Sequence, residues 1–158
     1  MRRVTIHLPG MQTFTETRLR VRYAETDQMG VVYYANHYIW MEVARVDFCK
    51  ARGFNYRDME REDGILMAVA ESACRYRAPA RFDDEIVIKS WIAEANPRAV
   101  TIHYEIRLAN DGRILATGHT RHIFVNRDMH RTRLPRKYFA MFGIPGPGHE
   151  AEPTKVVM

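Results

Sequence analysis

Alternating apolar and polar residues predict an antiparallel sheet. The clearest case is segment 100–108, in which five apolar residues alternate with polar ones, a period typical of a strand with one buried face. The turn sequence Asn110-Asp111-Gly112 follows, and 113–126 has the pattern of the returning strand of a hairpin. Similar patterns predict three more strands, at 14–23, 65–77 and 84–94.

One segment has the pattern of a helix instead. Residues 36–52 contain no Pro or Gly, Asn36 is a suitable N-cap, and Gly53 provides a C-terminal stop. The polar side of the helical wheel is narrow and includes Cys49. More than half of the wheel is apolar, through Ile39, Trp40, Met41, Val43, Ala44, Val46, Phe48 and Ala51. A helix so widely apolar is predicted to be buried inside a curved sheet. A short helix after Leu134-Pro135 is expected to close the domain.

The 158 residues suit one domain. We expect an unpatterned N-terminal extension at 1–12, a domain at 13–142, and a tail at 143–158 that begins with a Pro/Gly cluster. No apolar run is long enough to span a membrane, and the basic N-terminus lacks the apolar stretch of a signal peptide. The expected location is therefore the cytoplasm.

Several kinds of chemistry lack support in the sequence. Neither serine lies in a Gly-x-Ser-x-Gly motif, and dinucleotide-binding and P-loop motifs are absent. Cys49 and Cys74 are too few for a disulfide scaffold and are interpreted as structural. His119 and His122, three residues apart on a strand, should face opposite sides and are interpreted as surface or rim histidines. We therefore predict no metal and no cofactor.

The charge pattern bears on partners. Lys and Arg number 24 against 19 Asp and Glu, a net charge of +5. The basic residues are scattered among acidic ones without a nucleic-acid-binding signature, so no nucleic-acid partner is expected. Residues 127–137 hold five basic residues against Asp128 alone. Such a run is either a solvated surface or a contact for phosphate groups.

The segment 22–36 carries the candidate chemistry. A strand ends there, the carboxylates of Glu25 and Asp27 follow, Gly30 allows a turn, and the chain enters the predicted helix. The free N–H groups and the dipole at a helix N-terminus stabilise negative charge. A carboxylate at this position can act as base or nucleophile while the N–H groups hold an oxyanion. The alternative is that Asp27 only caps a turn and Gly30 only supplies a positive φ.

Residues 26–38 (TDQMGVVYYANHY), followed by 41–45 (MEVAR), resemble the signature of the 4-hydroxybenzoyl-CoA thioesterase family, which includes the Tol-Pal-associated acyl-CoA thioesterases. Residues 76–85 (YRAPARFDDE) resemble the second and third strands of that family. The resemblance covers about residues 14–140. It implies an α+β hotdog fold, in which a five-stranded antiparallel sheet wraps a long central helix, and it makes 13–142 a hotdog thioesterase domain.

The same resemblance implies roles for individual residues. Asp27 falls at the position of the family's catalytic carboxylate, and Tyr34 falls where a backbone N–H polarises the thioester carbonyl. Tol-Pal-associated members often have His at that second position, whereas the 4-hydroxybenzoyl-CoA enzymes have Tyr, as here. Arg98 follows the third strand, where family members place basic residues against the CoA nucleotide; the alternative is a solvated hairpin charge. The predicted substrate-binding residues are Gly30, Val31, Asn36 and Arg98.

The function implied is hydrolysis of an acyl-CoA, with an aromatic or a short- or medium-chain acyl group, to the free acid and CoA. Asp27 would act as nucleophile or as general base. Family sites form between two subunits, so the resemblance implies a homodimer, often paired into a homotetramer. Acyl-carrier protein is a further candidate carrier. The alternative function is a non-catalytic module that binds acyl-CoA or acyl-carrier protein.

Overall fold

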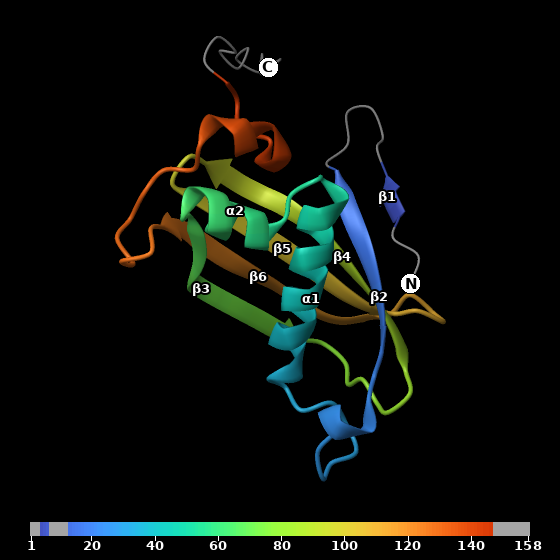
Figure 1. Ribbon diagram of the computed structural model, residues 1–158. Coiled ribbons are helices and arrows are strands. Elements are labelled where there is room, and N and C mark those ends of the chain that lie inside the picture. Colours follow the sequence, from blue (N-terminus) through green and yellow to red (C-terminus); the bar gives the residue numbers. More distant parts are fainter. Residues whose placement is uncertain (1–3, 7–12, 147–158) are drawn as a thin grey trace, which may run out of the picture.

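One antiparallel sheet forms the frame of the computed structural model, which describes residues 4–6 and 13–146 (Figure 1). Its strands are β1 (Val4–Ile6), β2 (Phe14–Arg20), β3 (Leu66–Tyr76), β4 (Glu85–Asn96), β5 (Ala99–Leu108) and β6 (Ile114–Val125). Their order across the sheet is β1-β2-β4-β5-β6-β3. The five predicted strands are confirmed. The three-residue β1, which pairs with β2, lies within the extension predicted to be unpatterned.

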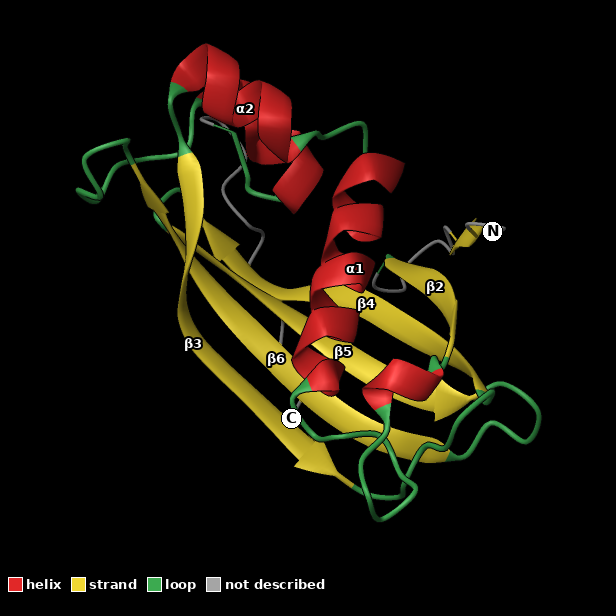
Figure 2. Cartoon of the chain, turned by 60° about the horizontal axis from the view of Figure 1, so that its bottom comes forward, coloured by secondary structure: helices red, strands yellow, loops and turns green. Residues whose placement is uncertain are grey.

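The long helix α1 (Asn36–Ala51) lies across one face of this sheet, as the α+β hotdog prediction requires (Figure 2). A second helix, α2 (Tyr56–Asp63), follows it and was not predicted. Two 3-10 helices, η1 (Tyr23–Glu25) and η2 (Arg136–Phe142), flank the ends of the sheet. The second is the short closing helix expected after Pro135. None of the helices in the described part of the chain is long and apolar enough to cross a membrane.

The core lies between α1 and the sheet. Alternate residues of β5, from Val100 to Leu108, face the helix and are buried. The helix contributes Trp40, Met41, Ala44 and Phe48. Gly118 of β6 is needed for this close approach, because a Cβ at that position would lie 2.3 Å from the Met41 Cε atom and 2.6 Å from the Ala73 carbonyl oxygen.

Three details of α1 differ from the sequence prediction. The helix is not buried all round, since the apolar side chain of Ile39 is 48% exposed on the side away from the sheet. Cys49, assigned to the polar side, is buried, and its thiol donates a 3.5 Å hydrogen bond to the Tyr56 hydroxyl. Asn36 is not the N-cap: Ala35 holds that position, and the Asn36 side chain instead donates a 2.9 Å hydrogen bond to the Glu25 carbonyl.

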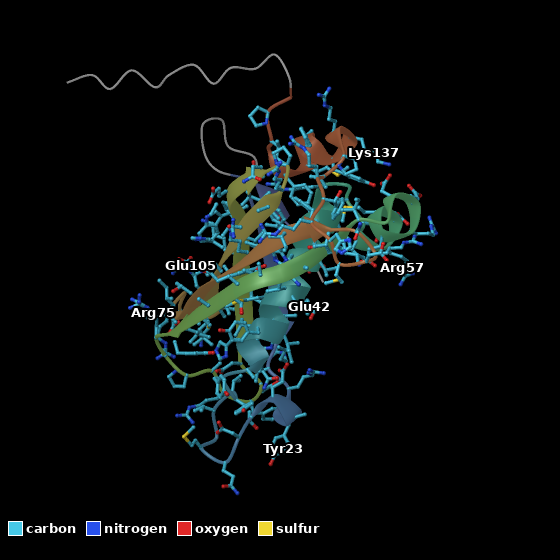
Figure 3. All side chains as sticks on the ribbon, turned by 90° about the vertical axis from the view of Figure 1, so that its left-hand side faces the viewer. Tyr23, Glu42, Arg57, Arg75, Glu105 and Lys137 are labelled. Carbon is cyan, nitrogen blue, oxygen red and sulfur yellow. The ribbon has the colours of Figure 1, made fainter. Side chains whose placement is uncertain are left out.

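Different connecting segments lie at the two ends of the sheet. The segment that links β2 to α1 lies at one end, and the turn between β4 and β5 lies at the other (Figure 1). Tyr23 and Lys137 mark these opposite ends in Figure 3. The ordered domain continues past the predicted limit at 142, because Ile144 is buried against the core. Most of the predicted tail, from residue 147 onward, lies outside the described residues.

Candidate active site

The segment between β2 and α1 is held in shape by Glu25, a carboxylate that the sequence analysis named beside Asp27 without a role of its own. Glu25 is only 4% exposed, and its side chain accepts hydrogen bonds from the Trp40 indole N–H (3.0 Å) and from the Arg22 backbone N–H (2.8 Å). Burial raises the pKa of this carboxyl, but the hydrogen bonds from Arg22 and Trp40 outweigh that effect, so the pKa lies below its usual range. Glu25 is therefore a buried anion that links the segment to α1.

The backbone carbonyl of Glu25 also fixes the entry to the helix. It accepts hydrogen bonds from the Tyr33 N–H (2.9 Å) and from the Asn36 side-chain amide (2.9 Å). Thr26 and Val32 form an isolated antiparallel bridge that closes the loop between them. As a result, the loop and the first residue of α1 are connected through several hydrogen bonds rather than through one.

Asp27 lies in this closed loop and is partly exposed. Its backbone N–H donates to the Val31 carbonyl, its carbonyl accepts from Gly30, and Gly30 has φ = 73°, as a tight turn here requires. One carboxylate oxygen, Oδ1, accepts a 2.8 Å hydrogen bond from the Met29 N–H. Both the turn role and a chemical role are compatible with this geometry, because within the described residues the other oxygen, Oδ2, forms no hydrogen bond.

Donors for an oxyanion lie at the start of α1. The first N–H groups of a helix have no partner within the helix. Here the Asn36 and His37 N–H groups bond back to the carbonyls of Tyr33 and Tyr34. In the part of the chain that the structure describes, the N–H groups of Tyr34 and Ala35 donate to no protein acceptor. They can serve a ligand oxygen at the positive end of the helix dipole.

The Tyr34 carbonyl is surrounded by aromatic side chains. Tyr76, at the end of β3, donates its hydroxyl to this oxygen (3.1 Å), and the His37 Nδ1 atom lies 3.1 Å from the same oxygen. The His37 ring also contacts the Trp40 and Tyr76 rings, with centroids 4.9 Å away in each case. Burial lowers the pKa of His37, so its imidazole is neutral at pH 7 and donates from Nδ1.

Five of the six predicted site residues come together, and the sixth does not. Asp27, Gly30, Val31, Tyr34 and Asn36 occupy the loop and the start of α1. Arg98 lies beyond the far end of β4, whose 12 residues span about 40 Å at roughly 3.3 Å each. Within one chain, therefore, Arg98 does not reach Asp27.

Arg98 lies instead in a second, strongly basic region. It lines a cavity of about 530 Å³ together with Arg121 of β6 and with Arg131 and Arg133 of the segment that connects β6 to η2. The cavity lining contains no carboxylate, and among the described residues none of these four guanidinium groups forms an ion pair. We call this cavity the arginine basin. Two of the five basic residues of the run 127–137, Arg131 and Arg133, therefore do line a site suited to anions.

The two histidines interpreted as surface or rim residues have different surroundings. They do face opposite sides of the sheet, as predicted. His119 is on the outer face, 2.8 Å from a carboxylate oxygen of Glu71. His122 is on the inner face and only 1% exposed, so for this residue the surface interpretation was wrong. Within the described residues, no group of three or more His, Cys, Asp or Glu side chains is arranged to hold a metal ion.

Comparisons with known proteins agree with this fold and motif. The profile of the Thioesterase-like superfamily matches residues 21–141. YneP of Bacillus subtilis, named as an acyl-CoA thioesterase, is 37% identical over 126 residues, which cover 79% of this chain and 89% of YneP. The chain belongs to the Thioesterase-like superfamily, and its enzyme class is that of a thioester hydrolase.

Solved structures agree with the hotdog architecture. The DHNA-CoA thioesterase from Staphylococcus aureus is 31% identical, with a TM-score of 0.78 and coverage of 82% of this chain and 89% of its own. A 4-hydroxybenzoyl CoA thioesterase is 17% identical, with a TM-score of 0.75 and coverage of 81% and 97%. At that identity the second similarity bears on the fold alone. The resemblance inferred from residues 26–45 is confirmed at the level of the superfamily.

Proposed function

We propose that this protein hydrolyses acyl-CoA thioesters at the start of α1, with Asp27 as the catalytic carboxylate. The observation that carries the proposal is the placement of Asp27 in a closed loop that leads directly to the N–H groups of Tyr34 and Ala35, which lack protein acceptors in the described structure. A carboxylate and an oxyanion site are the two components that thioester hydrolysis needs when no metal takes part.

Two reaction courses fit these groups. In the first, Asp27 attacks the thioester carbonyl carbon, the C–S bond breaks, CoA leaves as the thiol after protonation, and water then hydrolyses the mixed anhydride. In the second, Asp27 takes a proton from a water molecule that attacks the same carbon. In both courses the developing negative charge on the carbonyl oxygen is held by the N–H groups at the start of α1. Gly30, Val31 and Asn36 shape the surrounding wall.

A second copy of the chain would complete the site. β3 forms an edge of the sheet, and Val69 on this strand is 54% exposed; Ile39, on the outer side of α1, adds further exposed apolar surface. An edge strand of 11 residues is a template for strand pairing. A two-fold antiparallel pairing would bring the Leu66 end of one β3 beside the Tyr76 end of the other.

We therefore expect the purified protein to be a dimer or a tetramer. Light scattering at micromolar concentration should give at least twice the chain mass of 18.5 kDa. A Val69→Lys variant should shift the distribution toward monomer, because it places a charge at the proposed interface. A monomeric mass for the unmodified protein would contradict both the interface and the shared site.

The same pairing gives Arg98 a route to the substrate. Ala99 pairs with Ile123 and Leu66 pairs with Val125, so Arg98 lies at the Leu66 end of the sheet. In the proposed dimer this end of one subunit lies near the Asp27 loop of the other. The arginine basin of the partner then faces the part of CoA that extends away from the thioester, and its guanidinium groups suit phosphates.

Arg98→Ala is expected to raise KM for acyl-CoA several-fold and to leave kcat nearly unchanged, because a contact made equally to substrate and transition state affects binding only. The increase in KM should be larger at low salt, because the Arg98 side chain is exposed and dissolved ions screen its attraction to phosphate at higher salt. Steady-state kinetics on acyl-CoA and on a truncated thioester without the nucleotide test this. Equal losses on both substrates would assign Arg98 a structural role.

The proposal as a whole is tested with a panel of acyl-CoAs that covers benzoyl, hydroxybenzoyl, short-chain and medium-chain acyl groups, together with acyl-carrier-protein thioesters. Release of free thiol is followed with a thiol reagent. We expect turnover of at least one member. Tight binding of a thioester without thiol release, by protein of the expected mass, would instead support the non-catalytic binding module.

A further inference from the structure

The peptide group between Tyr34 and Ala35 is more heavily hydrogen-bonded than its neighbours at the start of α1. Its carbonyl oxygen, that of Tyr34, accepts three hydrogen bonds: from the backbone N–H of His37 (3.2 Å), from the Nδ1–H of His37 (3.1 Å) and from the hydroxyl of Tyr76 (3.1 Å). The preceding carbonyl, that of Tyr33, has one backbone donor, the Asn36 N–H at 3.0 Å. A single helical turn needs only one such bond, so the side-chain donors require another explanation.

The opposite end of this peptide group is the N–H of Ala35, one of the two candidate oxyanion donors. Hydrogen bonds to a carbonyl oxygen draw electron density along the amide and make its N–H a stronger donor, and bonds in such a chain reinforce one another. The two side chains also fix the plane of the peptide, so the N–H direction is set before a substrate arrives. Preorganised donors of this kind need no reorganisation during the reaction.

The two side chains are themselves held in place. His37 is buried and lies against Trp40, whose indole N–H is hydrogen-bonded to the buried carboxylate of Glu25. Tyr76 belongs to β3 and lies 42 residues after Tyr34 in the sequence. Its ring contacts the His37 ring edge-on. The Tyr34 carbonyl is therefore fixed by the helix and by the sheet together, which local helix geometry alone would not require.

We propose that Tyr76 and His37 are positioning residues that polarise and orient the Tyr34–Ala35 peptide, and that the Ala35 N–H is thereby a principal oxyanion donor. The inference rests on the proposed thioester hydrolysis and deepens it. Neither side chain needs to touch the substrate in this role; each acts through the peptide group.

Tyr76→Phe removes the hydroxyl and keeps the ring contacts. We expect kcat to fall about 3- to 10-fold with KM unchanged, less than the roughly 10²–10³-fold loss typical when an oxyanion donor itself is removed. Tyr23→Phe is the matched control, because Tyr23 is an exposed tyrosine at the same end of the molecule, 76% accessible, whose ring contacts Phe82. The control should retain full kcat. An unchanged kcat in Tyr76→Phe would overturn the role of the hydroxyl.

A second pair of variants tests His37. The amide nitrogen of Asn can occupy the place of the imidazole Nδ1, so His37→Asn should retain most of kcat, whereas His37→Leu should lose as much as Tyr76→Phe or more. Thermal unfolding of each variant monitors the fold. Equal activity losses in His37→Asn and His37→Leu, with equal losses of stability, would reduce His37 to a packing residue and overturn its proposed role.

A spectroscopic readout separates this inference from the identity of the carboxylate. In the Asp27→Asn background, the infrared carbonyl band of a bound, ¹³C-labelled thioester should shift to lower frequency than in solution, because the donors polarise it. Adding Tyr76→Phe should reverse part of that shift. An identical band in both proteins would overturn the polarising role, even where Asp27→Asn alone abolishes turnover.

If Asp27→Asn is fully active, the proposed mechanism fails, whereas the dependence of kcat on Tyr76 still tests the oxyanion site.

Discussion

Replacing Asp27 by Asn should lower kcat by about 10²–10⁴-fold, the typical contribution of a positioned proton-transfer group. The amide is nearly isosteric with the carboxylate, and its oxygen can still accept the 2.8 Å hydrogen bond from the Met29 N–H. The turn should therefore survive, while the neutral side chain is neither a competent base nor a comparable nucleophile. Steady-state thiol release and thermal unfolding of the same preparation measure both properties.

The chain offers a close control for this experiment. Asp111, in the hairpin turn between β5 and β6, also accepts a backbone hydrogen bond from the residue two positions on, Arg113, at 2.9 Å. Asp111→Asn repeats the chemical change in the same kind of turn, away from α1, and should leave kcat unaltered. More than about a tenth of the original activity in Asp27→Asn would mean that Asp27 only caps its turn.

The second large effect concerns acid stability. Burial, and to a lesser extent the nearby Arg45 cation, lower the pKa of His122 to about 3. In the unfolded chain the imidazole has an ordinary pKa near 6.5, so below that pH the unfolded state binds more protons and the folded state loses stability. The loss is about 1.4 kcal/mol per pH unit, or about 2–3 kcal/mol between pH 6.5 and 4.5. That is a large share of a total stability of about 5–15 kcal/mol.

Denaturant unfolding at a series of pH values measures this dependence. His122→Asn should make the curve less steep between pH 6.5 and 4.5, whatever its stability at pH 7, because this titrating group is gone; the buried His37, whose pKa is also lowered, keeps its own contribution. His130→Asn, a change at an exposed loop histidine, should leave the slope unchanged. A slope in His122→Asn as steep as in the unmodified protein would show that other groups cause the acid sensitivity. Glu25, whose pKa is also lowered, loses its contribution only at still lower pH.

Much of the fold could be predicted because its strands alternate regularly. The spacing of apolar residues predicts the five long strands and the central helix. The helix and four of these strands contain buried residues, whereas β3 contains none. The helix α2 was missed because seven of its eight residues, all but Met59, are not buried, so no apolar period marks it. His122 was predicted to lie on the surface because it is polar. Residues two apart on a strand face the same side, so its position two residues before the buried Phe124 on β6 places it on the inner face.

The candidate site was only partly predictable for a different reason. Asp27, Tyr34 and their neighbours lie in one continuous segment, so a sequence motif can identify them together. Glu25 gains its importance from Trp40, and Tyr76 from the Tyr34 carbonyl; both contacts depend on tertiary structure. Arg98 appears in the sequence as a turn residue, but only the pairing of the strands reveals that it lies at the end of the sheet opposite Asp27.

The central claim is that the thioester carbonyl is held by the start of α1 and faces Asp27. A crystal structure of Asp27→Asn with a bound acyl-CoA measures this most directly. We predict the carbonyl oxygen about 2.7–3.1 Å from the N–H of Tyr34 or Ala35, the carbonyl carbon next to the residue 27 side chain, and the nucleotide toward the arginine basin of a partner subunit. A thioester bound elsewhere, or with its carbonyl turned away from the helix, would contradict the account.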